Sequence, residues 1–220
     1  MSELCALLIS WLFLPTSPSR GLIVYDNPSL AAPDHVDSDG MTPLCAACEL
    51  APAKVAVALA VALLDGDADI DLATPATSDY AGFTPLMYAV AGINPGVAKL
   101  LLKRGADGTK RTTQAAGGHA AGSSALGMAR LCADSGDPDY VDTFTVLRKR
   151  CCSTCGVTSP GLAAKTAGEK KHLKRCGNCP ARGSRARYCG EECQRADWVS
   201  RHRRECAEAR RAREAAGTAV

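Results

Sequence analysis

The chain has 220 residues, which is enough for one large domain or two small ones. Apolar residues make up 46% of it and aromatic residues only 5%, so its core would consist of Ala, Leu and Val, a composition that favours helices over sheets. The net charge of +3 is unevenly divided. Residues 1–150 hold 11 Lys/Arg against 16 Asp/Glu, whereas residues 151–220 hold 15 Lys/Arg against 7 Asp/Glu. This difference indicates two units with different roles.

The distribution of cysteines argues against a secreted disulfide scaffold. Such a scaffold spreads its cysteines through the fold, whereas seven of the 12 cysteines lie within 152–206, in pairs with metal-like spacing. A reducing compartment and bound zinc are therefore expected.

The chain begins with an apolar run, LCALLISWLFL, at 4–14. A helix that spans a bilayer needs about 20 residues, so this run is too short for one. It could be the core of a signal peptide, but Glu3 rather than a basic residue precedes it and no clear cleavage site follows. We interpret residues 1–36 as an apolar N-terminal cap or a degenerate repeat, with a targeting segment as the alternative.

A repeat of roughly 40 residues comes next. DGMTPLCAACEL begins at Asp39, AGFTPLMYAVAG at Ala81, and a weaker copy, GSSALGMARLCA, at Gly122. A second apolar segment follows each opening, which predicts a helix–turn–helix unit.

Capping residues mark the ends of the predicted helices. Thr42 and Thr84 are predicted N-caps, each followed by a proline at the first helical position, where a missing N–H costs nothing. Gly66 and Gly105 stand where a left-handed residue would end a second helix. The apolar side of that helix in the second copy is expected to consist of Val97, Leu100, Leu101 and Leu102.

These residues resemble ankyrin repeats, with G-x-TPL-x-x-A at the start and LL-x-x-GAD at the end. The copy at 82–107 matches best, the first is stretched by an insertion around 67–79, and the third lacks the proline and the GAD ending. Cys45 and Met87 replace the family's histidine after TPL, so its local hydrogen bond is lost. The resemblance implies about three repeats over 37–150, stacked into a short solenoid that presents loops and first helices to a protein partner.

The pair Cys45 and Cys48 could be half of a metal site. The sequence offers no second pair close by to complete a tetrahedral set. We interpret both residues as small apolar core residues on the first helix of a repeat, because free cysteine behaves as a small hydrophobe.

Four pairs of metal-type ligands follow residue 150. They are Cys152 and Cys155, Cys176 and Cys179, Cys189 and Cys193, and His202 and Cys206. A C-x2-C spacing lets two thiolates of one tight turn reach one ion, and an x3 spacing puts both ligands on one face of a helix. A structural Zn²⁺ takes four ligands, so eight residues would fill two closed sites. The alternative is a set of free thiols in a disordered basic tail.

A catalytic role is disfavoured by the same number of ligands. A nucleophilic cysteine must be a free thiolate beside a base, and a catalytic zinc keeps one position open for water. HExxH, a Gly-rich phosphate loop and a Ser-centred elbow are also missing from the sequence. We therefore expect a protein that is not an enzyme.

The residues over 152–206 also resemble the MYND zinc finger. Its signature YC-x3-CQ-x3-W-x3-H-x3-C matches 188–206, and the two upstream pairs complete it. The resemblance implies two structural zinc ions with interleaved ligands, a pairing that spacing alone does not show: Cys152, Cys155, Cys189 and Cys193 at one ion, Cys176, Cys179, His202 and Cys206 at the other. The gap at 156–175 is longer than usual in the family and is interpreted as a flexible insertion. Cys151 is not assigned as a zinc ligand. Residues 207–220 are expected to form a basic helical or disordered tail.

The two resemblances together imply an adaptor between proteins. MYND fingers of the family bind short proline-rich peptides, which are already extended in the polyproline conformation. Gln194 and Trp198, four residues apart on one helical face, are the predicted peptide contacts; alternatively, Trp198 packs under the zinc sites and Gln194 is solvated. We expect an adaptor in the cytoplasm or nucleus, with a protein or proline-rich peptide partner and no membrane contact.

Nucleic-acid binding is the competing interpretation, as a zinc-binding regulator that uses the basic C-terminal unit. An excess of Lys and Arg attracts phosphate. However, the arginines are scattered, several lie in the tail, and this segment has only Tyr188 and Trp198 to stack on bases. The basic surface could equally attract the acidic repeat unit of the same chain.

Overall fold

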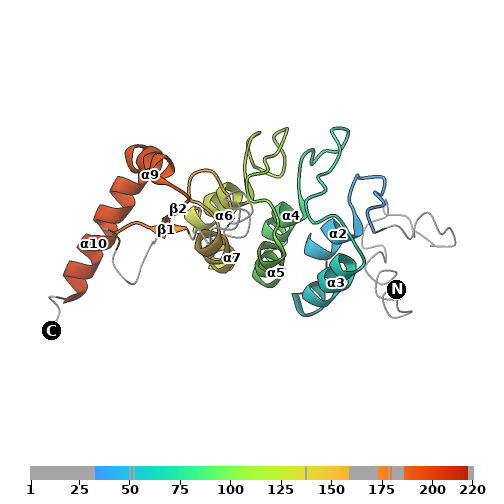
Figure 1. The fold of residues 1–220 in the computed structure, drawn as a ribbon, viewed down its shortest axis with the longest axis horizontal. Coiled ribbons are helices and arrows are strands. Elements are labelled where there is room, and N and C mark those ends of the chain that lie inside the picture. The colour runs from blue at the N-terminus through green and yellow to red at the C-terminus, as the bar shows by residue number, and fades with distance from the viewer. Residues whose placement is uncertain are drawn as a thin grey trace.

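The computed structural model describes residues 33–49, 51, 53–136, 138–158, 173–177, 179 and 186–217. Within these ranges a row of helix pairs leads into a small two-stranded unit and a long C-terminal helix (Figure 1). The predicted mainly helical class is confirmed, since the strands described are two of two residues each. The apolar run at 4–14 lies outside the described residues, as does most of the insertion at 156–175.

Two helix pairs begin the row. They are α2 (Pro43–Glu49) with α3 (Ala53–Asp65), and α4 (Pro85–Ala91) with α5 (Pro95–Arg104). Helix α2 packs against α4 and α3 against α5, so the pairs stack side by side (Figure 1). One apolar core runs through the stack and includes the fully buried Leu44, Leu86 and Leu101. As predicted, Cys45 and Cys48 are core residues with no exposed surface.

The N-terminal caps differ between the two pairs. The backbone N–H of Cys45 donates to Thr42 Oγ1 at 3.1 Å, as predicted for a capping threonine. The prediction for Thr84 is wrong in one respect, because its side chain makes no capping hydrogen bond. The N–H of Met87 donates instead to the Thr84 carbonyl at 2.9 Å, so the first turn is satisfied by backbone alone.

The C-terminal caps also differ. Gly105 has φ +102° and ends α5 in the left-handed conformation, as predicted. Gly66 does not play this part, because its φ is not positive. Asp67 is the left-handed residue after α3, with φ +65°, a conformation that aspartate tolerates better than most side chains.

Long loops rise on one side of the row between the pairs (Figure 1). Carboxylates tie each loop to the next one. Asp34 accepts a hydrogen bond from the N–H of Asp69, and Asp71 accepts one from the N–H of Asp107, both at 2.8 Å. The insertion at 67–79 is therefore an ordered part of the stack.

The weak third copy also forms a helix pair, α6 (Ala125–Asp134) and α7 (Pro138–Arg150). Ser124 caps α6 by accepting the N–H of Gly127 at 3.2 Å. Helix α6 packs on α4 and α7 on α5, and Met128 and Leu147 extend the common core. The copy thus keeps the packing of the others without their proline and GAD ending.

The C-terminal unit contains one short hairpin and one long helical rod. Strands β1 (Lys174–Arg175) and β2 (Arg187–Tyr188) pair antiparallel. Helix α9 (Glu191–Asp197), the π-helical segment η2 (Trp198–His202) and α10 (Arg203–Gly217) follow directly on one another. No helix in the described ranges is both long and apolar enough to cross a membrane.

The core of the stack predicts a large effect for truncation at Leu101. Leu101→Ala should lower the free energy of unfolding by about 2–5 kcal/mol, because the side chain is fully buried and the pairs on both sides limit collapse of the cavity. Leu131→Ala makes the same chemical change at a side chain that is 55% exposed and should cost less than about 0.5 kcal/mol. Urea unfolding of both variants checks this, and equal losses would contradict the described core.

Candidate metal centre

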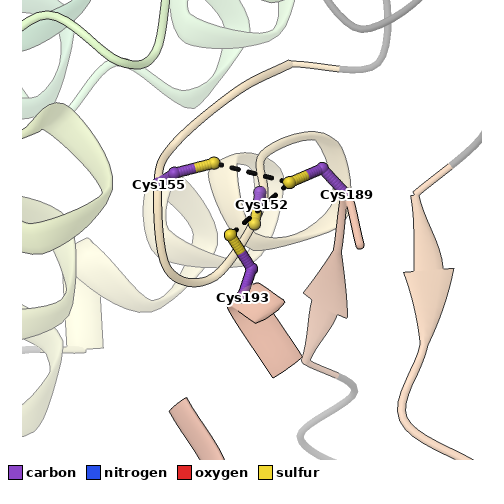
Figure 2. Close-up of side chains that lie close together, drawn as sticks. All are labelled: Cys152, Cys155, Cys189 and Cys193. Carbon is purple, nitrogen blue, oxygen red and sulfur yellow. Dashed lines mark hydrogen bonds between the residues drawn. The ribbon is translucent and has the colours of Figure 1, made fainter. Parts of the chain in front are cut away.

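The first group of ligands gathers four thiols from three segments of the chain. Cys152 and Cys155 lie in the turn after α7, Cys189 follows β2, and Cys193 lies in α9. Figure 2 shows the four side chains pointing toward one another. Cys189 Sγ is 3.6 Å from Cys155 Sγ and 3.5 Å from Cys193 Sγ.

The second group joins three thiols to one imidazole. Cys176 follows β1, Cys179 lies three residues further on, His202 ends η2 and Cys206 lies in α10. Cys179 Sγ is 3.2 Å from His202 Nε2 and 3.8 Å from Cys206 Sγ. His202 has no exposed surface, so its ring is committed to this group.

These distances fit tetrahedral zinc sites. With Zn–S bonds of about 2.3 Å, neighbouring sulfurs of a tetrahedron lie about 3.8 Å apart, whereas a disulfide brings them to about 2.05 Å. The ligand atoms of each group lie within 4.8 Å of one another, and the cysteines are free thiols. Three or four thiolates with at most one imidazole are the donor set that zinc prefers. Both groups therefore fit a structural zinc ion, which would supply folding energy by joining segments far apart in the sequence.

The eight residues come together in the interleaved pairing that the family resemblance implies. Each group takes one C-x2-C pair and one x3 pair, and the pairs alternate along the chain. One expected detail is wrong, because Cys189 and Cys193 do not share a helix face. Cys189 precedes Gly190, the N-cap of α9, and reaches its partner from the bend after β2.

A tight turn holds the first pair in place. The N–H of Gly156 donates to Cys152 O at 3.0 Å, and the N–H of Cys152 donates to Val157 O at 2.9 Å. Burial raises the pKa of the Cys152 thiol, but backbone N–H groups, those of Cys155 and Thr154 first, outweigh it and leave the pKa below its usual value. The turn thus aims donors at this sulfur, as a bound thiolate requires.

Two ligand thiols, one at each site, are harder to ionise without a metal. Burial raises the pKa of Cys189 to about 11 and that of Cys179 to about 12. Zinc binds the thiolate, so its binding has to displace these protons and weakens as the pH falls.

A partly buried polar network lies beside the imidazole. Nδ1 of His202 faces a carboxylate oxygen of Glu205 at 3.5 Å, on the side of the ring opposite Cys179. Arg201 pairs with Glu205 at 2.7 Å and also with Asp197, which is 4% exposed. The Glu205 carboxylate thus lies on the side from which a ligating histidine is oriented, although Nδ1 makes no hydrogen bond in this structure.

Tyr188 completes the network at the other end. Its hydroxyl donates to Asp197 at 2.7 Å, and its ring meets His202 edge-on. Burial, then the bond to Asp197, raises the pKa of this hydroxyl well above its usual range, so it remains a donor. Sequence reasoning did not identify Asp197, Arg201 and Glu205, although their i,i+4 spacing was a usable signal for ion pairs on one helix.

The two predicted peptide contacts lie beside this network. Gln194, within α9, and Trp198, the first residue of η2, are both half-buried. Trp198 packs on the finger core and meets the His202 ring edge-on, with centroids 5.9 Å apart. Trp198 therefore has the packing role considered as the alternative. Contact of Gln194 and Trp198 with a peptide stays a prediction.

Two family models match the chain, one described as "Ankyrin repeats (3 copies)" over residues 7–112 and one as "MYND finger" over 151–206. The chain carries ankyrin repeats followed by a MYND zinc finger, whose two clusters fit two structural zinc ions. The ankyrin match starts within the apolar run at 4–14 and ends before α6. No curated protein matches the chain.

Two adjacent buried cysteines make a matched test of ligand assignment. Cys152→Ser should reduce zinc from two ions per chain to one, because its sulfur belongs to the first group. Cys151→Ser should keep both ions, because burial raises the pKa of that thiol to about 12 and its side chain belongs to the repeat core. Native mass spectrometry gives the metal content of each, and loss of zinc from the Cys151 variant would contradict the assignment.

The network predicts a loss of stability without a loss of metal for Tyr188→Phe. Removing the hydroxyl leaves a buried carboxylate oxygen of Asp197 without its donor, which should cost about 1–3 kcal/mol. Tyr80→Phe, at a residue that is 40% exposed, is the control and should be nearly neutral. Urea unfolding of the zinc-loaded proteins measures both, and a neutral Tyr188→Phe would mean that the network does not hold the finger.

Proposed function

We propose that this ankyrin-repeat and MYND-finger chain is an intracellular adaptor, in which the finger binds a short proline-rich peptide and the repeats bind a second protein. Ankyrin repeats and MYND fingers are non-catalytic modules that mediate protein binding, which supports this role. Both ligand sets are complete with four protein donors, which suits structural zinc and leaves no position for a substrate. The protein is accordingly proposed to lack enzymatic activity.

The surface around Trp198 supports peptide binding by the finger. Trp198 packs against the core of the finger, which restrains its orientation, and the residue is only partly buried. Gln194 lies one turn before it and is also partly accessible. A rigid aromatic ring beside a polar amide can pack against a proline and hydrogen-bond to the exposed backbone of an extended peptide.

The loops of the repeats support binding of a second partner. They rise on one side of the stack and are joined by the carboxylate bonds from Asp34 and Asp71 (Figure 1). Because the loops are tied to one another, they present a pre-organised surface, which lowers the ordering cost of binding. The partner of this surface would differ from the peptide at the finger.

Nucleic-acid binding has one observation in its favour. Helix α10 carries exposed basic side chains, namely Arg203, Arg204, Arg210, Arg211 and Arg213. Glu208 and Glu214 interrupt the series, so the helix face is mixed in charge. We therefore treat this alternative as an outcome of the peptide experiment.

Truncation of Trp198 tests peptide binding. Trp198→Ala should abolish binding of a fluorescent proline-rich peptide, measured by anisotropy, because it removes the aromatic platform, while two zinc ions per chain are retained. Val199→Ala is the control, since Val199 is adjacent, apolar and 86% exposed but is not a predicted contact.

Two results would contradict the proposal. One is equal binding by wild type and the Trp198→Ala variant with zinc in place. The other is the absence of peptide binding together with salt-dependent binding of single-stranded RNA or DNA, which would establish the alternative.

A further inference from the structure

The finger follows the repeats without a linker. Helix α7 ends at Arg150, and the N–H of Cys151 still donates to Leu147 O at 2.8 Å in helical fashion. Cys151 is 1% exposed and belongs to the core of the repeats, whereas Cys152 is fully buried in the core of the finger. One peptide bond therefore connects the two cores, and the first zinc ligand is placed by the last helix of the stack.

A second contact joins the units through two glycines. Gly108 lies in the loop after α5, and Gly156 closes the turn around the first pair of cysteines. A Cβ at either glycine would overlap the carbonyl oxygen of the other, so the two backbones touch. The Gly108 Cβ position is also 3.4 Å from both Cys151 Sγ and Thr158 Cγ2. Gly108 has no left-handed φ, so its requirement for glycine comes from this contact.

A third contact is electrostatic. Arg130 of α6 and Arg148 of α7 both stack on Phe144, with guanidinium carbons 5.4 and 5.3 Å from the ring centroid. Burial lowers the pKa of Arg130 most, and the charge of Arg201 lowers it further, whereas the carboxylate of Glu205 raises it. Burial also lowers the pKa of Arg148, and Glu205 raises it. Arg130 and Arg148 of the last repeat thus interact electrostatically with Glu205, whereas Arg201 of the finger repels Arg130.

We propose that the zinc finger is the C-terminal cap of the repeat stack, docked on the end of α7 and the Gly108 loop so that loss of zinc also loosens the repeats. A repeat buries its apolar face only against a neighbour, so the last unit of a stack needs a cap. The finger supplies one over the end of α7 and the Gly108 loop. It covers the pair only in part, since Leu131 and Val141 remain exposed. This capping role does not depend on peptide binding.

Hydrogen–deuterium exchange in α6 tests the capping role, because α6 has no covalent link to the finger except through α7. In the full-length wild type, removal of zinc with a chelator should increase the exchange rate of α6 amides by about tenfold or more. Equal exchange with and without zinc would overturn the proposal.

Gly108→Ala separates docking from zinc binding. Its methyl group would displace the finger from the loop, so two zinc ions should remain while the zinc dependence of α6 exchange shrinks well below that of wild type. Gly127→Ala is the control, because this exposed glycine of α6 lies outside the finger and its Cβ would make only an ordinary contact of 3.4 Å with Ser124 Oγ, and it should keep the wild-type dependence. A full zinc dependence in the Gly108 variant would overturn the proposal.

Arg130→Gln provides an independent variant at the electrostatic contact. Any effect on α6 itself is present with and without zinc, so the ratio of the two exchange rates isolates the coupling to the finger. The ratio should fall by up to about fivefold, because the substitution removes the charge on which Glu205 and Asp197 act. Lys103→Gln, an exposed residue of α5, should leave the ratio unchanged. Equal ratios in the two variants would count against the electrostatic contact and the proposal that includes it.

Discussion

The closure of two tetrahedral ligand sets by interleaved pairs is the constraint on which the finger depends. The buried cluster of its described part has seven residues, and three of these are ligand cysteines. So small an apolar core offers little hydrophobic stabilisation, and metal binding has to provide the folding energy. Each ion also joins segments far apart in the sequence, over 152–193 at the first site and 176–206 at the second, so the spans of the two sites overlap.

The two zinc sites of the finger are supported by different neighbouring residues. At the first site, the turn of Cys152 continues directly from α7 and packs against the loop that holds Gly108. At the second site, His202 is backed by Glu205, which shares Arg201 with the buried Asp197 and Tyr188. The same helical rod carries Gln194 and Trp198, so the proposed peptide surface is positioned by the zinc ligands and by the repeats behind them.

Features that leave a pattern between residues close in the sequence could be predicted from the sequence. The TPL openings predicted the helix pairs, and ligand spacing with the family signature predicted both zinc sets. Local hydrogen bonding decided the details that failed: Thr84 needs no side-chain cap, and Asp67 rather than Gly66 turns left-handed. The contact of Gly108 with Gly156 could not be predicted, because it joins two turns of different units and leaves no periodic pattern. Residues 1–32 lie outside the described ranges, so the expectation of a cap or repeat there stays a prediction.

The central claim is that the two sites interleave, and cadmium-113 NMR of the substituted protein tests it most directly. Scalar couplings between each cadmium and the ligand side chains reveal which four residues share an ion. The structure predicts one resonance coupled to Cys152, Cys155, Cys189 and Cys193, and another coupled to Cys176, Cys179, His202 and Cys206. A single cadmium coupled to both Cys155 and Cys176 would show sequential pairing and contradict the described fold of the finger.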